Sequence, residues 1–159
     1  MPRPPALVTR REGDRITDRL AHLTKEAWRA FVRELQGRLA QHDVSFGHWT
    51  FLRILWEKDG LTQRELSDEA GVAEPSTNAA IKAMEELGYV TRKRLPDNRK
   101  NLYVRLTPKG RALRTKLEPI AQAVNRDAVR GIPARNVEAA RQVLVAVSEN
   151  LSRSSRRKP

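Results

Sequence analysis

Apolar residues recur at steps of three and four along much of the chain, and this spacing predicts amphipathic helices. The first helix is expected over about residues 16–40. Its apolar stripe carries Trp28, Phe31, Val32, Leu35 and Leu39. A second helix is expected from Ser45, a good N-cap, to a stop at Gly60. Two further apolar stripes, over residues 108–130 and from Val137 to Leu151, predict two more helices, so the chain is expected to be mainly helical.

Two short helices with a glycine turn between them are predicted over residues 62–87. Thr62 and Glu65 fit a reciprocal capping box at the start of the first helix. The second begins at Pro75, because a proline in the first turn loses no helical hydrogen bond. Its inward face is predicted to carry Thr77, Ala80, Ile81, Met84 and Leu87, and its outward face Ser76, Asn78, Ala79, Lys82 and Ala83. This arrangement is typical of a helix-turn-helix, whose second helix enters the major groove of DNA.

The hydrophobic period then changes from helical to alternating, which predicts a β-hairpin. Its strands are expected over residues 89–94 and 101–106, with a tip at residues 95–100. The hairpin is rich in cations: Arg92, Lys93, Arg94, Arg99, Lys100 and Arg105. Asp97, two residues before Arg99, is expected to hold that guanidinium by a charge-assisted hydrogen bond. A basic hairpin in this place is expected to act as a wing that contacts phosphates.

Charge and cysteine content narrow the class of protein. The 159 residues include 31 Lys and Arg against 19 Asp and Glu, a formal charge of +12 that attracts polyanions, nucleic acid first among them. The chain has no cysteine, which excludes disulfides and thiolate metal sites. No early apolar stretch resembles a secretory signal and no run is long enough to span a bilayer, so we expect a cytoplasmic protein without membrane contact. Residues 12–151 are expected to form a single domain, with flexible tails at 1–11 and 152–159.

Double-stranded DNA is therefore the expected partner. The residues expected to contact it are Ser76, Asn78, Lys82, Arg94, Asp97, Asn98, Arg99 and Lys100. One alternative is that the helix face and the arginines are merely solvated and that Asp97 and Asn98 are turn residues. Another is a non-specific architectural protein, which would use the same charge but bind every duplex alike.

Five short motifs carry a resemblance to a known family. They are Leu61–Leu66, Pro75–Asn78, Leu87–Val90, Asp97–Arg99 and Leu106–Gly110. In this order and spacing they resemble the MarR family, the bacterial multiple-antibiotic-resistance-type regulators, over about residues 30–130. Many members carry a basic or longer polar residue where this chain has Ala79, so base reading here is expected to depend more on the neighbouring polar residues.

The resemblance implies a mainly α fold with a small β-hairpin wing. A winged helix-turn-helix lobe is expected at about residues 45–106, and dimerisation helices at about 14–41 and 108–151. It further implies a homodimeric transcription regulator, expected to be a repressor, that binds a palindromic operator. The apolar seam of the last helix agrees with a dimer, because a monomer would leave it exposed.

The family resemblance also implies release from DNA by a small, often aromatic or phenolic, ligand. Candidate residues for its pocket are Trp28, His42, His48, Trp49 and Arg53. These side chains could instead be core tryptophans and ordinary polar groups. The histidines lack metal-ligand spacing, and we expect neither a metal nor a cofactor. The chain has no Gly-rich phosphate loop, nucleophile elbow or zinc-protease motif, so an enzyme is not expected.

Overall fold

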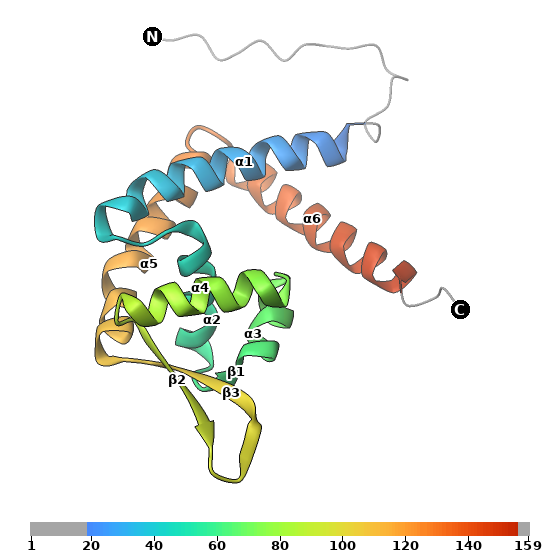
Figure 1. Ribbon diagram of the computed structural model, residues 1–159. Coiled ribbons are helices and arrows are strands. Elements are labelled where there is room, and N and C mark those ends of the chain that lie inside the picture. The colour runs from blue at the N-terminus through green and yellow to red at the C-terminus, as the bar shows by residue number, and fades with distance from the viewer. Residues whose placement is uncertain (1–18, 156–159) are drawn as a thin grey trace.

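The computed structural model describes residues 19–155, and these form a mainly helical fold with a small antiparallel sheet, as predicted (Figure 1). The elements are α1 (Leu20–Leu39), a 3-10 turn η1 (Ala40–His42), α2 (Phe46–Glu57), β1 (Leu61–Thr62), α3 (Gln63–Ala70), α4 (Glu74–Glu86), β2 (Val90–Leu95), β3 (Asn98–Leu106), α5 (Pro108–Ala128) and α6 (Ala134–Ser155). No helix in this part of the chain is long and apolar enough to cross a membrane.

Side-chain caps begin α2, α3 and α5 at the places where the sequence predicts these helices. The hydroxyl of Ser45 accepts a hydrogen bond from the backbone N–H of His48 at the start of α2. At α3, Thr62 and Glu65 form the complete capping box. At α5, the hydroxyl of Thr107 accepts from the Gly110 N–H at 3.0 Å, and Pro108 occupies the first turn. Each cap satisfies amides that a helix start would otherwise leave without a partner.

The hairpin is longer and its tip shorter than predicted. Strands β2 and β3 pair antiparallel as far as Leu95 and Asn98, so the turn consists of two residues, Pro96 and Asp97. The side chain of Arg94 donates to the backbone carbonyl of Arg99 at 2.5 Å and fastens the two strands close to the turn. Strand β1, which the sequence analysis did not predict, pairs with the other edge of β3 to give the order β1-β3-β2.

One hydrophobic core joins the described α-helices other than α6 with the three strands. Its residues come from α1, α2, α3, α4, the sheet and α5, and they include Leu39, Leu52, Leu55, Leu66, Ile81, Met84, Val104 and Leu117. The first turn of α5 lies against the sheet, and the rest of the helix packs on this core. At that first turn the Trp56 indole N–H donates to the Gly110 carbonyl at 3.0 Å. The lobe that contains the hairpin and helices α1 and α5 therefore form a single packed unit.

Both outer helices differ in extent from the prediction. Helix α1 begins at Leu20, and the expected residues 14–18 lie outside the described part of the chain. Helix α6 continues to Ser155, so residues 152–155 belong to a helix and not to a tail. An ion pair between Arg153 and Glu149, one turn apart, stabilises this last segment. The predicted tails 1–11 and 156–159 are outside the described residues.

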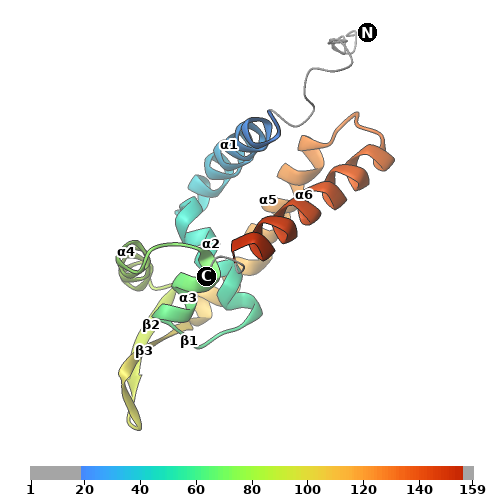
Figure 2. The ribbon, with the colours of Figure 1, turned by 90° about the vertical axis from the view of Figure 1, so that its right-hand side faces the viewer.

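Helix α6 lies apart from the core. None of its described residues is buried, and Val143, Leu144 and Val145 are about half exposed. Figures 1 and 2 show α6 running back from the end of α5 along the outside of the molecule. Its apolar residues therefore form an uncovered surface in the single chain.

Candidate nucleic-acid interface and ligand cavity

Helix α4 is anchored through its inner face, which leaves the outer face available to a partner. Thr77, Ile81 and Met84 are fully buried, as predicted for the inner face. Leu87, which was predicted to share that face, is instead partly exposed because the helix ends at Glu86 and Leu87 is its C-cap. On the other face the side chains of Ser76, Asn78 and Lys82 are exposed, as a contact with DNA requires.

The wing projects beyond α3 and α4, at the end of the molecule opposite to α1 (Figures 1 and 2). Five exposed cations lie on it: Lys93, Arg94, Arg99, Lys100 and Arg105. Within residues 19–155, none of these five side chains forms an ion pair with an acidic residue. Their charges are therefore available to an external polyanion. Asn98, also predicted to contact DNA, is half-buried, and its amide donates to the Tyr103 hydroxyl at 3.3 Å.

The expected pairing of Asp97 with Arg99 is not present. Among the described residues no hydrogen bond or ion pair joins the two side chains. The physical reason is the short turn: Asp97 is a turn residue, so it does not share a strand face with Arg99. Arg99 is held through its backbone carbonyl, by Arg94.

Arg92 differs from the other cations of the hairpin. Its side chain is only 19% exposed and forms an ion pair of 2.9 Å with Glu85 of α4. Its remaining guanidinium nitrogen donates to the side-chain carbonyl of Asn78, at 3.3 Å. Arg92 thus ties the wing to α4, a role that a count of basic residues could not predict because its acid partner is on another element.

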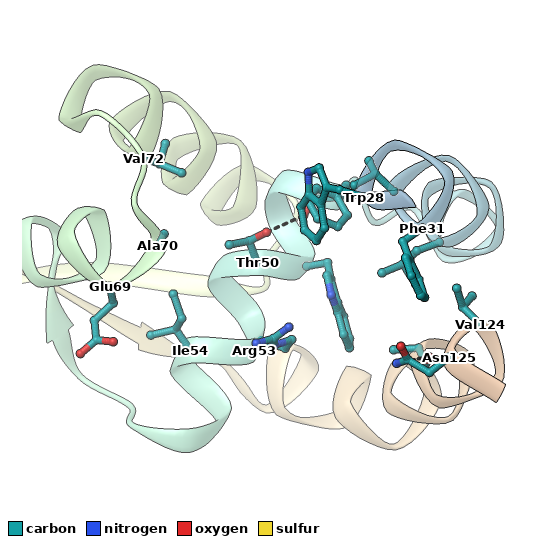
Figure 3. A pocket seen from close by; sticks show the side chains of 15 residues that line it. Trp28, Phe31, Thr50, Arg53, Ile54, Glu69, Ala70, Val72, Val124 and Asn125 are labelled. Atoms are coloured by element: carbon teal, nitrogen blue, oxygen red, sulfur yellow. Dashed lines mark hydrogen bonds between the residues drawn. The ribbon is translucent and has the colours of Figure 1, made fainter. Parts of the chain in front are cut away.

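A cavity of about 700 Å³ lies between the lobe that carries the wing and helices α1 and α5 (Figure 3). Its walls come from four regions: Trp28, Phe31, Val32 and Leu35 of α1; Phe46, Trp49, Thr50, Arg53 and Ile54 of α2; Glu69, Ala70 and Val72 around the end of α3; and Ala121, Val124 and Asn125 of α5. Most of these side chains are apolar. The volume and this lining suit a small organic molecule.

Three of the five predicted pocket residues line this cavity and two do not. Trp28, Trp49 and Arg53 are among its walls, whereas His42 and His48 are not. His42 belongs to the 3-10 turn η1. His48 precedes Trp49 on α2, whereas Thr50 and Arg53 extend the cavity face to the other side of Trp49, so a rotation of about 100° per residue turns His48 away from the cavity.

The two tryptophans contribute differently to the cavity. Trp28 is 57% exposed and lies edge-on to Phe46, with ring centroids 5.6 Å apart, so it stands at the mouth. Trp49 is buried and forms a wall inside. His48, outside the cavity, is half-buried, and burial lowers the pKa of its imidazole.

Sequence reasoning missed most of the lining. Phe31 and Val32 belong to the apolar stripe of the first predicted helix, so that stripe was a usable signal. Asn125 of α5 and Glu69 of α3 could not be found in this way, because only the tertiary fold brings them beside α2. Figure 3 shows these polar side chains on opposite sides of the cavity, with Arg53 between them. In the described part of the chain no cluster of three or more His, Asp or Glu side chains could hold a metal ion.

Comparisons with known proteins agree with this architecture. The sequence model of the MarR family matches residues 44–102. The HTH-type transcriptional regulator TtmR of Methylorubrum extorquens is 27% identical over 109 residues, which are 69% of this chain and 56% of TtmR. The chain spans about half the length of the curated relatives it matches first.

Solved structures extend the likeness to most of the chain. The transcriptional regulator PA3341 is 30% identical, with a TM-score of 0.73 that covers 84% of this chain and 98% of that one. BpsR of Bordetella bronchiseptica, whose DNA binding is regulated by 6-hydroxynicotinic acid, shares the fold at a TM-score of 0.76 and 18% identity, over 82% and 99% of the two chains. These relatives are regulators and not enzymes, which confirms the expectation of a non-enzymatic protein. By its motifs, its fold and this kinship, the chain belongs to the MarR family of winged-helix regulators.

Proposed function

We propose that this protein is a DNA-binding transcription regulator, a repressor that acts as a homodimer on a palindromic operator. The observation that carries the proposal is the exposed polar face of α4 next to a wing with five cations that have no acidic partner among the described residues. Helix α4 would enter the major groove, where Ser76 and Asn78 can form hydrogen bonds with base edges. The wing cations would bind phosphates on either side of the minor groove. A partner in chromosomal DNA also favours a cytoplasmic location.

The uncovered apolar surface of α6 supports a homodimer. Leu144 would be buried if the α6 helices of two chains packed together. The twofold axis would then hold two copies of α4 about 34 Å apart, one turn of B-form DNA, on the same side of the duplex. This geometry explains why a palindromic operator would suit the protein.

The cavity is the proposed site of a small aromatic effector. It has α1 and α5 on one side and α2 and α3 on the other, so a bound molecule would contact both this helix pair and the DNA-binding lobe. Such a molecule releases DNA only if it binds the DNA-incompetent arrangement more tightly. The regulation of BpsR by 6-hydroxynicotinic acid supports an aromatic acid as the first compound to test for release of DNA.

A non-specific architectural protein is the second candidate, since the wing cations would bind any duplex. The face of α4 favours the regulator, because Ser76 and Asn78 are uncharged groups suited to bases rather than phosphates. Selection of duplexes from a random library, followed by titration of the enriched and a scrambled sequence at physiological salt, separates the two. A specific regulator should prefer the enriched duplex by about a thousandfold or more. Equal affinity for both duplexes would establish the architectural function instead.

The contribution of the wing can be measured through the salt dependence of binding. Arg99→Gln should weaken binding to every sequence and lower the slope of log K against log salt by about one, because one phosphate contact is lost. Arg153→Gln is the matched control, since it removes the same charge from α6, where Arg153 pairs with Glu149. Equal effects of the two substitutions would mean that only net charge matters and that the wing is not at the interface.

A further inference from the structure

We propose that Arg92 is a positioning residue that fixes how Asn78 presents its amide to a base, so that Asn78 selects guanine. The inference rests on the proposed function, because it supposes that α4 lies in the major groove. It concerns the orientation of the Asn78 amide, which cannot be predicted from the sequence. The contacts of Arg92 with two residues of α4 carry it.

Glu85 holds Arg92 at both its backbone and its side chain. One carboxylate oxygen of Glu85 accepts from the backbone N–H of Arg92 at 3.0 Å. The other accepts from Nε and lies 2.9 Å from Nη2 of the same guanidinium. Because the Arg92 side chain is also only 19% exposed, its guanidinium has little freedom to turn toward solvent.

The third guanidinium nitrogen determines the orientation of Asn78. Nη1 of Arg92 donates to Oδ1 of Asn78 at 3.3 Å. A guanidinium has only donors, so the carbonyl end of the Asn78 amide must face it, since the reverse orientation would oppose N–H to N–H. The NH₂ group of the exposed Asn78 side chain is therefore the end left to contact DNA.

This orientation changes the base that Asn78 prefers. An unrestrained asparagine binds adenine through two hydrogen bonds, donating to N7 and accepting from the N6 amino group. With its carbonyl engaged by Arg92, Asn78 offers donors, and guanine presents two acceptors, N7 and O6, on its major-groove edge. Guanine should thus replace adenine as the preferred base at the position that Asn78 contacts.

The alternative is that Arg92 is one more phosphate-binding cation. Its ion pair with Glu85 opposes this, because the acid already neutralises the charge that a phosphate would use. Removal of Arg92 should therefore change which sequence is bound more than it changes the salt dependence. Removal of Arg94, which is exposed and has no acidic partner among the described residues, should do the reverse.

Selection from a random duplex library tests the inference with four variants beside the wild type: Asn78→Ala, Arg92→Met, Arg92→Lys and Arg94→Gln. The wild type should prefer guanine at one position of each half-site, and Asn78→Ala should lose the preference at that position only. Both Arg92 variants should shift it toward adenine by about tenfold, the discrimination of one good base contact. Arg92→Lys keeps the charge opposite Glu85 but cannot span to Asn78 as well, so it tests orientation even if Arg92→Met folds poorly. Arg94→Gln should bind more weakly with the same preferred bases.

Two results would overturn the inference while the proposed function stands. One is a wild type that prefers adenine at the position that depends on Asn78. The other is an unchanged preference in a folded Arg92→Lys protein, judged by its circular dichroism. A wild type that enriches no sequence at all would contradict the proposed regulator itself.

Discussion

The arginines of the hairpin differ in what their guanidinium groups contact. Arg92 is bound by Glu85 and Asn78 of α4, whereas the Arg99 side chain is exposed and the Arg99 backbone carbonyl accepts from Arg94. Composition counts all three as equal contributions to a charge of +12. The structure separates one that is bound to α4 from two whose guanidinium groups have no acidic partner among the described residues.

Two glycines differ in how much space surrounds them, and this difference gives a pair of matched predictions. A Cβ added to Gly110 would lie 2.0 Å from the backbone carbonyl oxygen of Tyr89, whereas one added to Gly37 would meet nothing within 4 Å. Gly110→Ala should therefore destabilise the protein by about 3 kcal/mol, because α5 must move away from the sheet. Gly37→Ala should stabilise it by about 0.5–1 kcal/mol, the helix-interior advantage of alanine.

Urea denaturation of both variants at one protein concentration measures the difference. A single concentration is needed because association would shift the apparent stability. A Gly110→Ala protein as stable as the wild type would show that α5 does not need to approach Tyr89 so closely, and that the glycine in the Leu106–Gly110 motif has another role.

At the scale of elements, helix caps govern where the chain turns, and the capping box of α3 gives a prediction that depends on pH. The backbone N–H and then the hydroxyl of Thr62 donate to the Glu65 carboxylate and hold its pKa below the ordinary value of 4.5. Thr62→Ala should cost about 1 kcal/mol at neutral pH. A lowered pKa means that the contribution of Glu65 is present above its ordinary pKa and is lost as the pH falls through the lowered value. The deficit of Thr62→Ala should therefore shrink in acid.

Denaturation of the wild type and Thr62→Ala from neutral pH to below the Glu65 pKa measures this. Thr24→Ala is the control, because that hydroxyl donates to the Leu20 carbonyl inside α1 and caps nothing. Its effect should stay within about 0.5 kcal/mol at every pH. If the two variants lost stability equally, or if the Thr62→Ala deficit grew in acid, the capping box would not be the source of the stability.

Local signals predicted these elements well. Ser45, the Thr62 capping box and Pro75 each satisfy or avoid a backbone hydrogen bond within a few residues, so their effect can be deduced from neighbours in sequence. Strand β1 was missed because it has two residues and exists only through its pairing with Val104 and Tyr103. The short turn at the tip was also missed, since a run of polar residues does not show where strand pairing stops.

The residues of the candidate site could likewise be predicted where local sequence determines their position, and not where tertiary packing does. Ser76, Asn78 and Lys82 were placed on the outer face of α4 by helical period alone. The link from Arg92 to Glu85 and the cavity wall formed by α5 could not be predicted, because both depend on which elements pack together. His48 was included for its residue type, and it lies on the side of α2 that faces away from the lining residues Thr50 and Arg53.

At the scale of the whole molecule, the exposed apolar surface of α6 gives the prediction on assembly. Leu144 is 45% exposed on a helix without buried residues among those described. If α6 packs against a second copy, Leu144→Glu should weaken the dimer about 30-fold, for a cost of about 2 kcal/mol at the interface. Sedimentation velocity over a range of concentrations measures the equilibrium.

Gln142→Glu is the control for that experiment. It adds the same charge two residues earlier on α6, about 200° around the helix and so on the opposite face. It should leave the dimer intact. A wild type that sediments as a monomer, or equal weakening by both substitutions, would show that α6 does not form the interface through this face.

Helix α5 is fixed to different parts of the molecule at its two ends. Its first turn contacts Tyr89 and Trp56, and near its last turn Asp127 accepts from Arg38 of α1 at 2.7 Å. A chimaera could exchange the winged helix-turn-helix lobe between relatives by joining the two chains after Leu106. That junction would separate α5 from the core residues on which it packs. A graft that keeps its native register must carry the donor's α5 at least through Leu117, together with the α2 surface on which it rests.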